Sequence, residues 1–109
     1  MTYSTENLWQ SAPTSTLART LASMSDEETM RNFLRDVMTE KEIVEISARF
    51  EAARLLSMGE QYTSISKRTK LSSRTIARIS DWLKNGSRGY AEALKIASSH
   101  HEHIPPARD

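Results

Sequence analysis

The sequence predicts an all-α protein of six helices, and three observations lead to this prediction. Apolar residues recur at intervals of three and four along most of the chain, which is the spacing of one helix face. The chain is divided into segments of helical length by residue pairs typical of helix starts and by glycines typical of helix ends. No segment shows the alternation of apolar and polar residues that is typical of strands.

The N-terminal part is expected to be a flexible arm over residues 1–15, followed by one helical domain over residues 16–99. The arm shows no apolar periodicity and contains Pro13. Leu17, Leu21 and Met24 then recur at helical spacing and predict the first helix.

Two capping boxes predict the next two helix starts. Ser25 with Glu28 is expected to open the second helix, and Thr39 with Glu42 the third and longest one. Gly59 is expected to end the long helix, because the residue after a helix often adopts a left-handed conformation that suits glycine. The apolar stripes of the two helices are Met30, Phe33, Leu34 and Val37, and then Ile43, Ile46, Phe50, Ala53, Leu55 and Leu56.

Two short helices and a last one complete the predicted domain. The first short helix begins near Thr63, and the second begins at Ser72 or Ser73, both good capping residues. Asn85 and Gly86 end the second, and the last helix starts at about Gly89. Residues 100–109 contain two adjacent prolines and are expected to form a disordered tail.

Composition excludes several kinds of site. The 109 residues include no cysteine, so disulfides and thiolate zinc sites are excluded. No apolar run is long enough to span a membrane, and the N-terminus does not have the pattern of a signal peptide, so a soluble cytoplasmic protein is expected.

Catalysis finds little support in the sequence. It has no nucleophile elbow, no phosphate-binding loop and no histidine inside the predicted domain to act as a base. His100, His101 and His103 offer imidazoles to a metal, but they lie on the predicted tail without a carboxylate framework. We therefore expect neither an enzyme nor a resident metal or cofactor.

Charge is strongly polarised along the chain, although the net charge is only +1. Residues 66–88 contain seven basic residues and a single acid, Asp81, which gives this stretch a net charge of +6. The basic residues are Lys67, Arg68, Lys70, Arg74, Arg78, Lys84 and Arg88. Such a stretch is typical either of a surface that binds a polyanion or of a solvated helical face.

The stretch from Tyr62 to Leu83 fits a helix-turn-helix. The motif requires apolar residues in both helices and in the turn; Ile65, Leu71, Ile76 and Ile79 supply them. Arg74 and Arg78 then fall on the opposite face of the second helix, where arginine can bind guanine in the major groove. The predicted DNA-contacting residues are Thr63, Ser64, Lys67, Arg68, Ser72, Ser73, Arg74, Thr75, Ala77 and Arg78. A helical hairpin with a purely structural role has the same pattern.

From about Leu17 to Leu94 the chain resembles the Trp repressor superfamily, and more closely its YerC/YecD-type branch. The residues that carry the resemblance are Met38-Thr39, Arg49, Leu55-Leu56 with Gly59, the hairpin from Ile65 to Ile79, and the segment from Leu83 to Tyr90. The resemblance implies an intertwined homodimer that exchanges its N-terminal helices. It also implies two recognition helices about 34 Å apart on double-stranded DNA, with a roughly palindromic site.

The resemblance also implies a possible effector pocket at Thr39, Arg49 and Arg78, which match the threonine and two arginines that contact tryptophan in the Trp repressor. Two positions depart from that pattern, because Ile79 stands where the family has a glycine and Trp82 where it has a serine. Both side chains are expected to fill the space of an indole ring. We therefore expect that tryptophan is not the corepressor, which leaves a ligand-free repressor or another effector.

Two functions remain open from the sequence. The first is a sequence-specific transcriptional regulator, a repressor that blocks polymerase by occupying its operator as a dimer. The second is a helical dimer that binds a partner protein through its basic face, without sequence-specific DNA binding.

Overall fold

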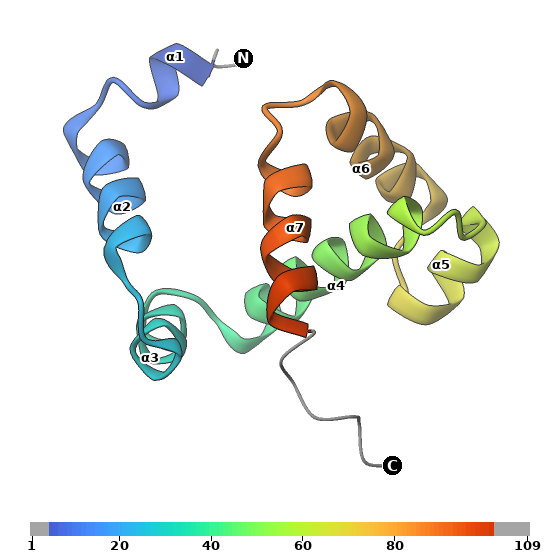
Figure 1. Cartoon of the computed structure of the whole chain (residues 1–109), viewed down its shortest axis with the longest axis horizontal. Helices are drawn as coiled ribbons and strands as arrows, with labels where there is room; N and C mark the ends of the chain where they lie inside the picture. Colours follow the sequence, from blue (N-terminus) through green and yellow to red (C-terminus); the bar gives the residue numbers. More distant parts are fainter. Residues whose placement is uncertain (1–4, 102–109) are drawn as a thin grey trace. The chain divides into compact units, whose positions relative to one another are not determined.

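The computed structural model describes residues 5–101, and within this range every regular element is an α-helix (Figure 1). The all-α prediction is therefore confirmed. Six helices have eight or more residues, and a four-residue α1 precedes them. The helices are α1 (Thr5–Leu8), α2 (Ala12–Ser23), α3 (Glu27–Val37), α4 (Glu40–Ser57), α5 (Tyr62–Thr69), α6 (Ser73–Asn85) and α7 (Gly89–His101). The chain divides into two compact units after Ile43, in the first turn of α4.

The N-terminal segment is more helical than expected. Within residues 1–15, the segment predicted to be a flexible arm, α1 forms and α2 begins at Ala12. Pro13 lies in the first turn of α2, where its missing N–H has no helical partner to lose. The Ser11 side chain accepts a hydrogen bond from the Thr14 N–H at 3.3 Å and caps the helix. The disordered tail predicted from residue 100 falls outside the described residues, apart from the last turn of α7.

Capping was predicted correctly for one helix and wrongly for another. In the capping box of α4, the Thr39 N–H donates to Glu42 Oε1 at 2.8 Å and the Glu42 N–H donates to Thr39 Oγ1 at 3.1 Å. For α3 the cap is Asp26 instead of Ser25. Its Oδ2 accepts from both the N–H and the hydroxyl of Thr29, and these hydrogen bonds lower the pKa of the Asp26 carboxyl.

The N-terminal unit leaves part of its apolar surface exposed. Neither α2 nor α3 contains a fully buried residue, and the side chains of Leu17 and Val37 are 46% and 57% exposed. Leu17 and Val37 each belong to an apolar stripe that was expected to be buried. Apolar surface of this kind is typical of an interface that another chain covers.

The C-terminal unit contains the core. Its fully buried side chains come from α4, α5 and α6, and Leu56, Leu71, Tyr90 and Leu94 pack against them. The buried residues are Ala52, Ala53, Leu55, Ile65, Ile76 and Ile79. The stripe predicted for α4 is buried only in its C-terminal half, because Ile46 is 54% exposed. The long helix thus supports the hairpin at one end and exposes apolar surface at the other.

The end of α4 is closed by Gly59, as predicted. The Glu60 N–H donates to the Leu55 carbonyl and the Gly59 N–H to the Leu56 carbonyl, both at 3.0 Å, which is a Schellman motif. Gly59 has φ +85°, in the left-handed region that disfavours other residues. The motif turns the chain from α4 into α5 within four residues, Met58 to Gln61.

Replacement of Gly59 by alanine is expected to lower the free energy of unfolding by about 1 kcal/mol. The cost arises from φ alone, because a Cβ at this position would meet no atom within 4 Å. Gly89→Ala is the matched control, since that glycine also has open space around it and its φ is not positive. Urea unfolding of both variants at one protein concentration measures the difference. Equal stability of the two variants would contradict the left-handed assignment.

Candidate nucleic-acid interface

The hairpin of α5 and α6 is held together by apolar side chains on the inner faces of its two helices. Ile65 on α5 and Ile76 and Ile79 on α6 are all fully buried, and Leu71 in the connection packs against the same core. These are the four positions that the sequence pattern selected. In Figure 1, α5 and α6 follow each other through the short connection of residues 70–72, and the two helices are in contact.

Side-chain hydroxyls fix the turn between the two helices. The Ser66 hydroxyl donates to the Leu71 carbonyl at 2.7 Å, so a small polar side chain links α5 to the connection that follows it. Thr69, which the sequence did not single out, is 9% exposed; its hydroxyl donates to the Ile65 carbonyl and accepts from the Leu71 N–H. Its position among apolar residues gave no signal, because threonine is more often exposed than buried.

Lys70 occupies the position in the turn where glycine is common. Its φ is +66°, in the left-handed region, and its N–H donates to the Ser66 carbonyl at 2.8 Å. A residue other than glycine pays a cost of about 1 kcal/mol to hold this conformation. The ammonium group stays exposed, so the turn adds a positive charge beside the start of α6.

The start of α6 is capped by Ser72, one of the two residues that the sequence offered for this role. Its hydroxyl accepts from the Thr75 N–H at 3.2 Å and lies 3.1 Å from the Thr75 hydroxyl. Ser73 is exposed and Thr75 half-buried. No acidic residue stands in the first turn of α6, so the positive end of the helix dipole is not neutralised there.

The exposed face of α6 carries Arg74, Ala77, Arg78 and Asp81, spaced as i, i+3, i+4 and i+7. Together with Trp82 they line a shallow hollow of about 470 Å³. Ala77 is small enough to let another surface approach closely between the two arginines. The buried Ile76 and Ile79 lie on the opposite face, as the helical spacing predicted.

The remaining predicted contact residues lie on α5. Thr63, Lys67 and Arg68 are exposed, whereas Ser64 is half-buried. The Ser64 hydroxyl donates to Glu60 Oε1 at 3.0 Å, which directs it toward a carboxylate of the chain itself. Lys67 and Arg68 therefore provide the positive charge of this helix.

The three residues of the predicted effector pocket stand in different surroundings. Thr39 forms the capping box of α4, in the N-terminal unit. Arg49 is half-buried and lines a groove of about 600 Å³ in the C-terminal unit. Arg78 lines the hollow on the exposed face of α6.

The groove beside Arg49 is rich in aromatic side chains. It is bounded by α4, the end of α6 and the start of α7, and its lining includes Phe50, Trp82 and Tyr90. Burial raises the pKa of the Tyr90 hydroxyl, and the nearby charge of Arg49 partly offsets this effect. Trp82 also lines the hollow with Arg74 and Arg78, so this residue borders both the groove and the exposed face of α6.

Ile79 and Trp82, the two departures from the family pattern, differ in their burial. Ile79 belongs to the core of the hairpin and is fully buried. Trp82 is 43% exposed in the single chain and is not part of its buried core. Of the two residues, Trp82 is the one that lines the groove beside Arg49.

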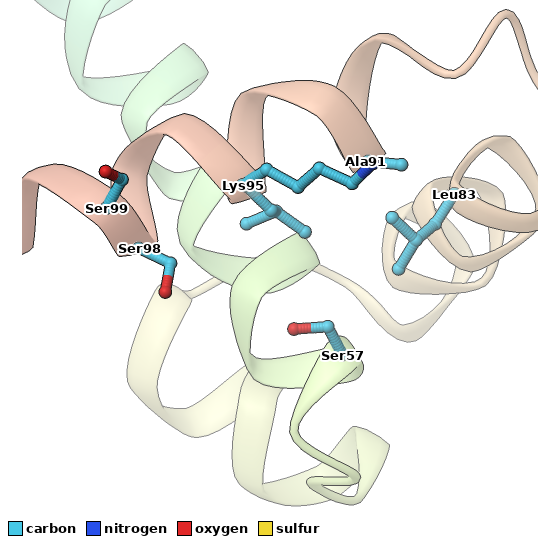
Figure 2. Close-up of a pocket in the computed structure, with 7 residues that line it drawn as sticks. Ser57, Leu83, Ala91, Lys95, Ser98 and Ser99 are labelled. Carbon is cyan, nitrogen blue, oxygen red and sulfur yellow. The ribbon is translucent and has the colours of Figure 1, made fainter.

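A further groove of about 640 Å³ contains none of the predicted DNA-contacting or effector-pocket residues. Figure 2 shows its lining on three helices, with Ser57 on α4, Leu83 on α6 and Ala91, Lys95, Ser98 and Ser99 on α7. Lys95 Nζ lies 3.5 Å from Glu92 Oε2 on the same helix. These side chains carry no arrangement typical of catalysis.

The described residues contain neither a metal-binding cluster nor a helix that could span a membrane. No group of three or more histidine, cysteine, aspartate or glutamate side chains lies close enough there to hold a metal ion. The side chains of His100, His101 and His103 fall outside that range. Among the described helices, none combines the length and apolar character that a membrane span requires.

Comparisons with known proteins agree on one family. The sequence profile of the family described as Trp repressor protein matches residues 13–98. A solved TrpR like protein from Eubacterium eligens ATCC 27750 is 29% identical, with a TM-score of 0.76 over 83% of this chain and 93% of that one. A candidate Trp repressor from Staphylococcus aureus is 23% identical and has a similar fold, with a TM-score of 0.77 over 88% and 96% of the two chains. Among curated proteins, none matches the chain.

Proposed function

The chain belongs to the Trp repressor protein family, a family of DNA-binding regulators and not of enzymes, and from this premise we propose that it is a sequence-specific transcriptional repressor. Its α5 and α6 act as a helix-turn-helix, with α6 as the recognition helix. The repressor occupies a roughly palindromic operator and so excludes polymerase. It works in the cytoplasm, where the DNA of its bacterial relatives lies.

The observation that carries this proposal is the division of α6 into two faces. One face is anchored in the core by Ile76 and Ile79, while the other exposes Arg74 and Arg78 around the small Ala77. A rigid helix of this kind can enter the major groove and direct arginines at guanine. Lys67, Arg68 and the capped start of α6 are then available for backbone phosphates.

The test of DNA binding is the salt dependence of affinity for duplex DNA, measured by fluorescence anisotropy. A surface that neutralises several phosphates releases bound counterions, so the logarithm of the affinity should fall steeply and linearly with the logarithm of the salt concentration. The absence of measurable duplex binding at low salt would favour the alternative, a module that binds a partner protein through the same basic face.

The repressor is proposed to act as a homodimer that exchanges its N-terminal helices. The support for this is the apolar surface left open in a single chain, which includes Leu17 and Val37 in the N-terminal unit and Ile46 on α4. A second copy that covers these side chains would complete the core of a chain too small to bury them alone. Sedimentation equilibrium at micromolar concentration should give twice the chain mass. A well-folded monomer at that concentration would refute the dimer.

The effector pocket formed by Thr39, Arg49 and Arg78 stays a proposal, and we expect that tryptophan does not bind there. Trp82 lines the groove beside Arg49. It is much larger than the serine of the family pattern, and this bulk supports the expectation that a free indole is not accommodated. Titration calorimetry with tryptophan should give no heat of binding. A clear binding isotherm would overturn this expectation and make tryptophan the corepressor.

A further inference from the structure

Asp81 is an acid on a surface that is otherwise basic. Between residues 66 and 88 it is the only acidic residue among seven basic ones. Its side chain is exposed and lines the same hollow as Arg74, Ala77 and Arg78. A surface that only attracted phosphate would gain nothing from a carboxylate here, since like charges repel.

The Asp81 carboxylate is also oriented. The Asn85 amide, one turn further along α6, donates a hydrogen bond to Asp81 Oδ1 at 2.9 Å. Among the described residues, no other hydrogen bond or ion pair engages this carboxylate. Oδ2 is therefore a free acceptor on the exposed face of the helix.

Base edges in the major groove present hydrogen-bond donors to a carboxylate, whereas phosphates present only acceptors. Cytosine exposes its N4 amino group there, and aspartate is one of the side chains that accept a hydrogen bond from it. Arg74 and Asp81 are seven residues apart, which corresponds to about 10 Å along a helix. This distance matches about three base-pair steps. A helix that lies along the groove with Arg74 on guanine can therefore bring Asp81 to a base further along the site.

We propose that Asp81 is a specificity-determining residue, whose Oδ2 accepts a hydrogen bond from the N4 amino group of a cytosine in each half-site. The inference rests on the proposed function and deepens it. The carboxylate favours cytosine at one position and, through its charge, weakens binding to every duplex that offers only phosphates. Asn85 acts as its positioning residue.

The experiment compares the wild-type chain with Asp81→Ala and with Asp36→Ala as a matched control. Asp36 is an exposed acid on α3, outside the hairpin, and its replacement removes the same charge and the same side chain. Alanine is a strong helix former, so both variants should keep their helical circular dichroism. A duplex selected by the wild-type chain is then changed one base pair at a time, and each affinity is measured by anisotropy.

The wild-type chain and Asp36→Ala should each lose about tenfold in affinity when one particular cytosine is replaced. Asp81→Ala should bind all four bases at that position within about twofold and should bind random duplex more tightly than Asp36→Ala does. If Asp81→Ala kept the wild-type base preference at every position of the site, the role proposed for Asp81 would be wrong, while the proposed function would stand. A wild-type chain that selects no duplex at all would overturn the proposed function as well.

Discussion

Replacement of Ile79 by alanine is expected to lower the free energy of unfolding by about 2–5 kcal/mol. Ile79 is fully buried, and it is one of only four large side chains in the described core, the others being Leu55, Ile65 and Ile76. The two remaining residues of the buried core are Ala52 and Ala53, whose side chains are too short to fill the space. The loss of three carbon atoms therefore leaves a cavity between α4, α5 and α6. Urea unfolding at a fixed protein concentration measures the change.

A graded series separates cavity formation from other causes. Ile79→Val removes one carbon atom and is expected to cost about 1 kcal/mol. Arg74→Ala is the control on the same helix, since its side chain is exposed and its removal should change stability by less than about 0.5 kcal/mol. If Ile79→Ala were as stable as this control, the proposed anchoring of α6 would be wrong.

Replacement of Arg74 by alanine is expected to weaken binding to the operator by about 1–3 kcal/mol for each half-site. A dimer carries the substitution twice, so the combined loss is about 2–6 kcal/mol, which is a factor of about thirty or more. The variant should also lose base preference at one position per half-site. The reason is that a bidentate arginine contact depends on the O6 and N7 acceptors that only guanine presents in this arrangement.

Lys67→Ala gives the contrast to this prediction. Lys67 is exposed on α5 and is proposed to contact phosphate, so its loss should weaken binding to all duplexes alike and reduce the salt dependence. Anisotropy titrations of both variants, with the operator and with random duplex, separate the two kinds of contact. Equal effects of Arg74→Ala on operator and random duplex would show that Arg74 contacts only the backbone.

Local signals in the sequence predicted most helix boundaries because the groups that form them are close in sequence. The Thr39 and Glu42 box and the Gly59 stop depend on residues within one or two turns, and the structure contains both. The same closeness explains the error at α3. Ser25 and Asp26 are both good caps three residues before a suitable partner, and the sequence alone does not separate them. Asp26 prevails with two hydrogen bonds and with a negative charge at the helix N-terminus.

Burial was harder to predict because it depends on contacts far apart in the chain. The stripes containing Leu17, Val37 and Ile46 have the spacing of a buried helix face, yet all three side chains are more than 45% exposed. An apolar stripe predicts that a face will be covered, but not whether the same chain or a second copy covers it. Pro13 was interpreted as a sign of a flexible arm, but it lies in the first turn of α2. Proline is tolerated at that position of a helix.

The candidate DNA-contacting face could be predicted from the sequence to a large extent. Helical spacing alone separates Arg74 and Arg78 from Ile76 and Ile79, because all four lie on one helix. Two features were not predictable in this way: the burial of Thr69, and the place of Trp82 beside both the groove and the hollow. Both depend on how the helices pack against one another. Such meetings between helices are set by tertiary packing, which no local pattern describes.

Sequence-specific DNA binding by α6 is tested most directly by the ratio of affinities for a selected duplex and for random duplex, measured with the wild-type chain at physiological salt. A duplex library is first enriched on the purified protein, and both affinities are then determined by anisotropy. A sequence-specific repressor should enrich a two-fold symmetric site and bind it at least about a thousandfold more tightly than random DNA. A ratio near one, or a library from which no sequence is enriched, would contradict the claim that α6 reads DNA sequence.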